Sequence, residues 1–345
     1  MNKKKAVATA AALAALSAGA WAQSSVQLTG TVDAFAGAMQ MAGATRTNVL
    51  NSGGMTTSQF AFKGTEDLGG GLRAGFTLAS YLQLDSGASG RFTGDTLFSQ
   101  AANVSLSGSF GTVVIGRGQA PNYLPTIFFN PFGDSFTFSP LVLHSEVPLY
   151  GKTGLVWNSA VPADAGWNNR ILYSTPSLAG LVANVYYQFG EVAGSNGKNN
   201  VGANLMYSNG PFAATAFYEK DQVTNPGNSV VFSTNDRKTD WMLGASYDFN
   251  VAKAFATYGK ASSNILVPTS KTMSLGVSVP VGLGKILADT ARTEISPSGA
   301  TRRTSTVGYD HNLSKRTDAY ANVMRDSITG LASGTSWGVG LRHRF

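Results

Sequence analysis

The residue types that could do chemistry come closest together at positions 144–146, where His144, Ser145 and Glu146 follow one another. A Ser/His/acid triad requires side chains that the fold brings into one geometry, and adjacency in the sequence does not provide it. Glu66 and Asp67 are also adjacent, but successive strand residues point to opposite faces, so these carboxylates do not pair for acid–base work. We therefore expect no catalytic residues and no enzymatic activity.

The sequence also offers little for metal or cofactor chemistry. It contains no cysteine, which excludes a disulfide framework, a thiolate metal site and a thiol nucleophile. None of its three histidines (His144, His311 and His343) has a histidine partner three or four residues away, so a histidine-based metal site is not expected. No phosphate-binding motif of the G-x-x-x-x-G-K-[ST] type occurs. We expect neither a metal nor a cofactor.

The N-terminal segment has the features of an export signal. Three lysines at positions 3–5 precede an apolar run at 6–16, and the small-x-small sequence at 20–22 fits a cleavage site. The run is too short to span a bilayer as a helix. We expect residues 1–22 to be a signal peptide and residues 23–345 to form a single barrel domain, since no shift in composition marks a second one.

The charge of the chain says little about partners once this segment is set aside. Removing its three lysines from the 26 basic residues leaves 23 against 19 acidic ones, a net charge of +4 instead of +7. This weak excess does not favour a nucleic-acid partner.

The remaining chain has the alternation of a transmembrane β-barrel. It has no run of 18 apolar residues that could form a membrane-spanning helix. Segments of about ten residues instead alternate between apolar and polar side chains, as strands do when one face meets lipid and the other a water-filled lumen. In 241–249, for example, Trp241, Leu243 and Tyr247 share one face and Ser246 and Asp248 the other.

Sixteen such segments can be counted, an even number that puts both termini on the same side. Short connections alternate with long ones, which predicts periplasmic turns and extracellular loops. The expected strands are 25–40, 56–66, 71–84, 96–108, 111–117, 168–175, 180–190, 199–208, 211–222, 238–249, 253–262, 270–280, 284–294, 302–312, 315–325 and 335–345.

Five segments, in this order, resemble the trimeric general-diffusion porins of Gram-negative bacteria, and the neisserial and β-proteobacterial branch in particular. They span essentially the whole chain after residue 22, and each alone would be weak. The segments are FAFKGTEDLGGGL at 60–72, VSLSGSFGTVVIGR at 104–117, NNRILYSTP at 168–176, LSKRT at 313–317 and GLRHRF at 340–345.

The resemblance implies a 16-stranded antiparallel barrel in the outer membrane that lets small hydrophilic solutes and ions diffuse passively. It implies a homotrimer in which each subunit is a separate pore, surrounded by outer-membrane lipid and lipopolysaccharide. The terminal aromatic, Phe345, is similar to the signal that the barrel-assembly machinery reads, although aromatic residues are also frequent at membrane interfaces.

The resemblance places the functional centre in the third extracellular loop, 118–167, which in the family folds into the barrel and narrows it. A loop this long without structure of its own is usually functional. The turn from Asn130 to Asp134 looks like its acidic tip, and Asp134 and Glu146 are the carboxylates expected at the constriction. A solvent-facing position in the loop is the alternative for both acids.

Opposite this loop, the family carries arginines on the barrel wall, and the field between acids and bases sets ion selectivity. Here Gln59 and Gln100 stand where the family usually has arginine, while Arg170 matches a wall arginine. We therefore expect a constriction with fewer cations than its relatives and weaker anion selectivity, or none. Alternation offers Lys63, Arg73 and Arg117 as further inward-facing cations and Asp33 as an inward acid, whereas Arg342 and Arg344 are expected to be vestibule charges with little effect.

Three alternatives remain at this point. The first is a substrate-selective channel on the same barrel, in which glutamines would hydrogen-bond a solute. The loop phenylalanines could then form an apolar track, although pinning the loop to the wall is the simpler use for them; they are Phe128, Phe129, Phe132, Phe136 and Phe138. The second is an outer-membrane enzyme, for which no converging triad is visible. The third is a structural or adhesive barrel whose lumen is sealed by the third loop.

Overall fold

The computed structural model describes most of the chain after the N-terminal segment. The described residues are 25–91, 94–145, 165–191, 193–194, 199–222, 237–263 and 269–345. The expected signal peptide at 1–22 and the candidate acid Glu146 therefore lie outside the described residues. No helix in the described part is both long and apolar enough to cross a bilayer.

The described residues form one antiparallel sheet and two short helices. The strands are β1 (Ser25–Met39), β2 (Thr47–Ser52), β3 (Gln59–Gly69), β4 (Leu72–Tyr81), β5 (Ala101–Gly108), β6 (Gly111–Gln119), β7 (Gly166–Ser174), β8 (Leu181–Gln188), β9 (Val201–Asn209), β10 (Phe212–Gln222), β11 (Arg237–Asp248), β12 (Lys253–Ser263), β13 (Thr269–Val281), β14 (Gly284–Ser296), β15 (Thr301–Asn312), β16 (Thr317–Ile328) and β17 (Gly334–Arg344). The helices are α2 (Tyr123–Phe128) and α3 (Pro140–Ser145).

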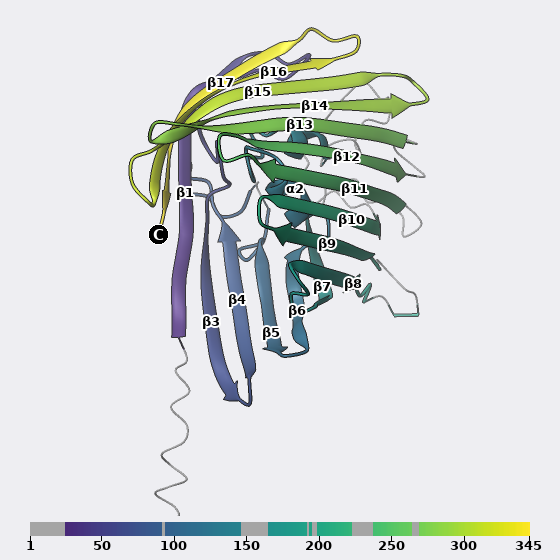
Figure 1. Ribbon diagram of the computed structural model, residues 1–345. Helices are drawn as coiled ribbons and strands as arrows, with labels where there is room; N and C mark the ends of the chain where they lie inside the picture. The colour runs from purple at the N-terminus through teal and green to yellow at the C-terminus, as the bar shows by residue number, and fades with distance from the viewer. Residues whose placement is uncertain are drawn as a thin grey trace, which may run out of the picture.

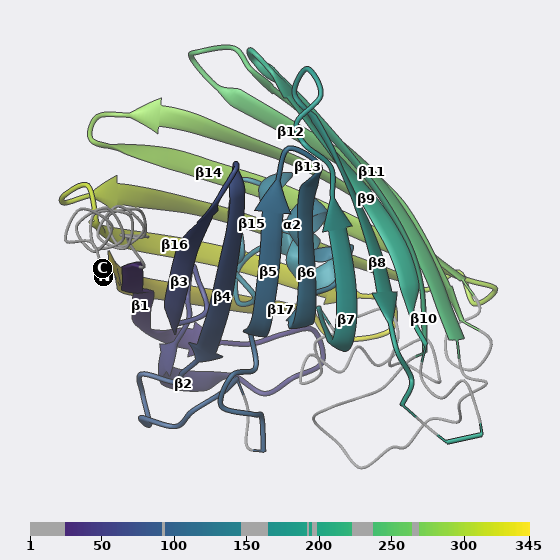
Figure 2. The same cartoon turned by 90° about the horizontal axis from the view of Figure 1, so that it is seen from below.

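The sheet closes into a barrel, as the sequence predicts (Figures 1 and 2). The strands β1 and β3–β17 pair in chain order, and β17 returns to β1 in a register that sets Ala34 opposite Leu341 and Thr31 opposite Arg344. Pairing around the closed wall lets the N–H and C=O groups of neighbouring strands bond to one another, which a bilayer requires because it offers no water. Sixteen strands make the wall; the seventeenth, β2, is a short segment paired only with the upper part of β1.

Side chains alternate between lipid and lumen along the wall. On β16 and β15, Val323 and Val307 are exposed on the outer face, whereas Asp326 and Thr306 are buried on the inner one. The alternation expected in 241–249 is confirmed for Leu243 and Tyr247, which are exposed, and for Ser246, which is buried, whereas Asp248 is exposed. This period of two assigns each wall residue to lipid or to the lumen.

The second wall strand departs from the sequence prediction. A loop was expected at 41–55 before a strand at 56–66, but the structure forms β2 within that loop and begins β3 at Gln59, with residues 53–58 turned away from the ladder between the two pieces. Gly53 takes a left-handed conformation there, with φ +79°. A side chain on Gly54 would collide with the ring of Tyr320, so the inward turn needs a glycine at that position.

Asp33 holds this inward turn in place. Its buried carboxylate accepts hydrogen bonds from the backbone N–H groups of Gly54, Met55 and Thr56 at 3.1, 2.8 and 2.8 Å. The hydroxyl of Tyr320 donates a further bond to it. Three donors that left the β-ladder thereby find an acceptor, which matters because an unpaired buried N–H is costly. Asp33, which was predicted to point inward on the first strand, therefore holds the turn between β2 and β3 in place.

The described part of the third loop, up to residue 145, lies inside the barrel and packs against one side of its wall (Figure 2). Proline at the first position and the hydroxyl of Ser139, which accepts from the N–H of Val142 at 3.4 Å, favour the start of α3. The ring of Phe138 packs edge-on against that of Phe35, with centroids 5.5 Å apart. The core that joins the loop to the wall contains Phe35, Met55, Phe132, Phe138, Leu143, Leu287, Tyr320 and Met324.

This core makes a prediction about the loop aromatics. Phe138 is fully buried (0%), whereas Phe128 is 56% exposed. Replacing a buried phenylalanine by alanine costs about 3–5 kcal/mol, so Phe138→Ala should loosen the loop, and Phe128→Ala should not. Single-channel recordings should show more open-channel current noise for the first variant alone. Equal noise in both variants would contradict the role given to this core.

Candidate pore constriction

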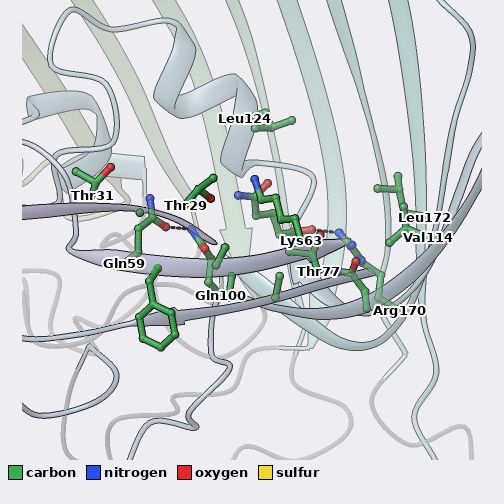
Figure 3. Close-up of a pocket in the computed structure, with 18 of the residues that line it drawn as sticks. Thr29, Thr31, Gln59, Lys63, Thr77, Gln100, Val114, Leu124, Arg170 and Leu172 are labelled. Atoms are coloured by element: carbon green, nitrogen blue, oxygen red, sulfur yellow. Dashed lines mark hydrogen bonds between the residues drawn. The ribbon is translucent and has the colours of Figure 1, made fainter. Parts of the chain in front are cut away.

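An open cavity of about 550 Å³ lies between the third loop and one side of the barrel wall. Residues of β1 and β3–β8 line its wall side, and Leu124 of α2 faces them from the loop (Figure 3). The opposite side of the loop is filled by the core that contains Phe138 and Leu143. The cavity therefore lies on the side of the loop away from this core.

Gln59 and Gln100 meet on the cavity wall, on either side of β4. The amide nitrogen Nε2 of Gln100 donates a hydrogen bond to Oε1 of Gln59 (Figure 3). Gln59 begins β3, and Gln100 precedes β5, where its backbone N–H bonds to the carbonyl of Ala79 at 3.2 Å. Two positions with no obvious link in the sequence therefore present one neutral amide pair to the cavity.

Arg170 lines the same cavity but is held close to the wall. Its side chain is only 4% exposed, and Nη1 donates to the carbonyl oxygen of Gln119 at 2.5 Å. The guanidinium also lies over the ring of Tyr186, 5.7 Å from its centroid. Stacking and the short bond fix its orientation, so Arg170 contributes a fixed positive charge to the wall.

Two further cations line the cavity in different ways. Lys63 is exposed on β3, and none of the described ion pairs involves it. Arg344, the last residue of β17, also lines the cavity, and its Nη1 contacts Oδ2 of Asp318 at 2.7 Å. The carboxylate offsets part of the Arg344 charge, so Lys63 is the cation with the clearest access to the cavity.

Asp134 does not line this cavity. It borders a second one, of about 350 Å³, on the other side of the loop tip, together with Lys253, Lys285 and Arg342. Its carboxylate accepts a bond from the hydroxyl of Thr56 at 3.0 Å, and that same hydroxyl accepts one from Arg342 at 2.9 Å. Burial raises the pKa of the Asp134 carboxyl above its ordinary value. The acid thus joins the loop tip to the inward turn at 53–58.

Two other contacts complete the attachment of the loop tip. The hydroxyl of Ser135 donates to the carbonyl of Gly54 at 2.6 Å, and that of Thr137 to the carbonyl of Gly53 at 2.8 Å. Asn130 closes the turn itself, because its amide donates to the carbonyl of Gly133 at 2.9 Å. The acidic turn expected from the sequence is therefore present and is docked on the segment that Asp33 holds.

Arg73 and Arg117 lie away from the cavity. Arg73 is exposed at the start of β4, beside the short turn at 69–71, so it belongs to the periplasmic end of the lumen. Arg117, which was expected to point inward, is not among the residues that line the cavity. It falls where the pairing of β6 with β7 shifts register, and its guanidinium donates to Ser99 and Asn168 at 2.6 Å each.

His144 is a docking residue that the sequence did not reveal. Its two ring nitrogens lie 2.8 Å from the hydroxyls of Thr293 on β14 and Thr304 on β15. Those partners are 149 and 160 residues away in the sequence, so no local pattern could indicate them. Burial, and then the nearby Arg302 guanidinium, hold the pKa of His144 well below its usual range.

Arg342 has a larger structural role than the sequence indicates. It was expected to be a vestibule charge, but it is buried and bonds Asp318 at 3.0 Å and Asp310 at 3.2 Å as well as Thr56. It therefore links β15, β16 and β17 to the loop tip through Thr56. Burial of a charge requires such partners, and the sequence shows only that Arg342 faces inward.

Comparison with known proteins gives consistent matches over the length of the chain. A family model described as Gram-negative porin matches residues 8–331. The outer membrane porin protein 32 of Delftia acidovorans is 33% identical, covering 99% of this chain and 100% of that protein. An outer membrane porin protein of Bordetella pertussis is 26% identical over the same shares of the two chains.

Solved structures agree with this. An anion-selective porin from Comamonas acidovorans has 27% sequence identity and a TM-score of 0.77, covering 93% of this chain and 100% of that one. OmpT, an outer membrane protein of Vibrio cholerae, has 13% identity and a TM-score of 0.67 over 93% and 98% of the two chains, a likeness of fold alone.

The contacts of His144 predict a pH dependence. A neutral imidazole has one donor and one acceptor nitrogen, which suits two hydroxyl partners. Where the loop is undocked or unfolded, His144 takes up a proton below about pH 6.5, and the docked ring resists it. The contribution of His144 to the free energy of unfolding is therefore complete above that pH. It falls, by at most about 1.4 kcal/mol per pH unit, as the pH drops below it.

The matched variant is His144→Gln, which does not titrate. Urea unfolding midpoints of the detergent-solubilised protein, measured from pH 7.5 to pH 5, should fall less steeply for this variant than for the unchanged chain. Parallel slopes for the two proteins would contradict the neutral, doubly bonded His144.

Proposed function

Because the chain belongs to the Gram-negative porin family and is a diffusion channel of the bacterial outer membrane, we propose that solutes cross it through the cavity beside α2. The observation that carries this route is the one-sided packing of the third loop. One face of the loop is packed on the core around Phe138, the other borders about 550 Å³, and the loop tip borders the second cavity of about 350 Å³. Small hydrophilic solutes and ions then pass between Leu124 and the wall of β3–β8.

The proposed constriction is neutral on one part of its wall and positive on another. Gln59 and Gln100 form the neutral part, and Lys63 and Arg170 the positive part. No aspartate or glutamate is among the described residues that line the cavity. Charged groups around a narrow passage set its ion preference. We expect a weak preference for anions, which Lys63 dominates because Arg170 is nearly buried.

The comparison with the anion-selective Comamonas porin supports a preference for anions, and the two glutamines support a weak one.

Asp134 and Glu146 complete the proposed set of charges from the loop side. Asp134 acts on the second cavity, which also holds Lys253, Lys285 and Arg342. That cavity would form the continuation of the path toward the periplasm.

The open cavity favours passage over a sealed structural barrel. An enzymatic role receives no support, because His144 is engaged by two threonines of the wall and lies on the side of the loop away from the cavity. A glutamine pair could also bind a particular solute, and saturation of the conductance by that solute would then replace simple diffusion.

Further properties follow from the family resemblance as proposals. Three chains would assemble as a homotrimer in a membrane of outer-membrane lipid and lipopolysaccharide. Residues 1–22 would be removed on export. Phe345 would be read by the barrel-assembly machinery, and its position supports this, because its N–H and C=O both pair with Gly30 at 3.0 Å where the barrel closes.

The charge assignment can be tested by reversal potentials across a planar bilayer under a salt gradient. A charge about 4 Å from a passing ion changes its energy by about 1 kcal/mol in a water-like medium, or roughly fivefold in permeability. Lys63→Gln should lower the anion-to-cation permeability ratio by about this factor. The double variant Gln59→Arg, Gln100→Arg should raise it.

Arg73→Gln is the matched control, because it removes the same charge outside the cavity and should leave the ratio unchanged. A strongly anion-selective unchanged chain would contradict the weakening assigned to Gln59 and Gln100. An equal effect of Arg73→Gln and Lys63→Gln would contradict the proposed position of the constriction.

A further inference from the structure

A group of exposed cations lies on the outward face of five neighbouring strands, β12 to β16, near the end of the barrel that carries the loops expected to be extracellular (Figure 1). Their direction follows from the period of two, because Thr293 and Thr304, which stand next to two of them, bind His144 inside the barrel. The five cations are Lys260, Lys271, Arg292, Arg303 and Arg325.

The sheet register places these like charges next to one another. Lys260 of β12 lies directly opposite Lys271 of β13, and Arg292 of β14 lies directly opposite Arg303 of β15. Arg325 of β16 pairs two positions further along β15, which makes it a diagonal neighbour of Arg303. Like charges that face each other across two strands destabilise the sheet. An anion bound between them would remove this cost.

One acid lies within the group and offsets part of its charge. Glu294 faces Lys271 across the ladder, and its Oε2 is 4.0 Å from Nη2 of Arg292. It is the one acid among the described outward positions of β12 to β16. Five positive charges and one negative charge leave a net charge of +4 on this part of the outer surface.

The apolar residues beside the group show its level in the membrane. On β12, the next outward residue toward the periplasmic end from Lys260 is Tyr258, whose ring packs edge-on against that of Trp241 with centroids 5.7 Å apart. On β13, the corresponding neighbour of Lys271 is Met273, which is exposed. Aromatic residues of membrane barrels gather at the interface with water. The cations therefore lie just beyond the apolar band, at the level of the lipid head groups.

We propose that this group binds the phosphate groups of one lipopolysaccharide molecule in the outer leaflet, with Arg292 and Arg303 at its centre. The planar guanidinium offers paired donors that match phosphate oxygens, and the lysines add positive charge around them. Five strands with a spacing of about 4.8 Å extend over roughly 19 Å, which suits a head group with more than one phosphate. The inference rests on the lipopolysaccharide surroundings given as part of the proposed function, and it assigns the residues that bind this lipid.

The fixed cations give this site a property that can be measured. Arginine and lysine supply the positive charge themselves, so the phosphates need no divalent metal ion to be held there. Binding should therefore persist in EDTA. A lipid bound across β12 to β16 also links five strands of the wall and should stabilise the folded barrel, since a ligand that binds only the folded state shifts the unfolding equilibrium.

Binding is tested by native mass spectrometry of the folded protein in detergent and EDTA, titrated with bisphosphoryl lipid A, the phosphorylated lipid anchor of lipopolysaccharide. The double variant Arg292→Gln, Arg303→Gln should bind it at least about tenfold more weakly, because two charge-assisted hydrogen bonds are lost. The matched control, Lys315→Gln, Arg316→Gln, removes two exposed cations from the short turn before β16 and should bind as the unchanged chain does. Monophosphoryl lipid A should bind the unchanged chain more weakly than the bisphosphoryl form.

Urea unfolding gives a second measurement on the same proteins. Bisphosphoryl lipid A should raise the unfolding midpoint of the unchanged chain and of the control, and it should raise that of Arg292→Gln, Arg303→Gln much less. Without lipid, this variant should be at least as stable as the unchanged chain, because a pair of facing like charges is gone. Heat-modifiable mobility on a gel verifies that each variant is folded.

Equal affinity of the two double variants for bisphosphoryl lipid A would overturn the proposal, as would no binding by the unchanged chain. Displacement of the lipid by millimolar inorganic phosphate would identify free phosphate as the ligand and overturn the lipid. Single-channel conductance of the same preparations tests the channel separately. A conducting barrel that binds no lipid A contradicts this inference alone, whereas a barrel that binds lipid A and does not conduct contradicts the proposed function alone.

Discussion

Backbone hydrogen bonding in a bilayer is the constraint on which the rest of this structure depends. A wall with no water outside must pair its own N–H and C=O groups, and closure of β17 on β1 does so. The second wall strand breaks the ladder at 53–58, and the inner carboxylate of Asp33 replaces the lost partners of three N–H groups. One acid on the lumen face thus allows a segment of the wall to turn inward.

That inward turn determines where the pore can be. It offers the carbonyls of Gly53 and Gly54 and the hydroxyl of Thr56 to the loop tip, while His144 fixes the end of α3 to β14 and β15. The loop is therefore held against one side of the lumen by polar contacts at two places and by apolar packing between them. The wall that carries the glutamine pair and Lys63 borders the open cavity on the other face of the loop.

The sequence predicts the wall well because its signal is local. Period-two alternation and short turns locate all sixteen wall strands to within a few residues, and they place Asp33 inward. The docking of the loop is not local. Neither the threonines that bind His144 nor the meeting of Gln59 with Gln100 across β4 can be found from spacing, since both depend on how distant strands are brought together. The register shift beside Arg117 likewise depends on the partner strand, β7.

The central claim, that solutes pass on one side of the loop, is tested most directly by placing single cysteines in this cysteine-free chain. Thr77 lines the open cavity, whereas Ser274 is buried on the opposite wall, where its hydroxyl bonds Asp289 at 2.7 Å. A charged, water-soluble thiol reagent added during single-channel recording should lower the conductance of Thr77→Cys in steps and leave Ser274→Cys unchanged. Stepwise block of Ser274→Cys, with Thr77→Cys unaffected, would place the path on the other side of the loop and contradict the account.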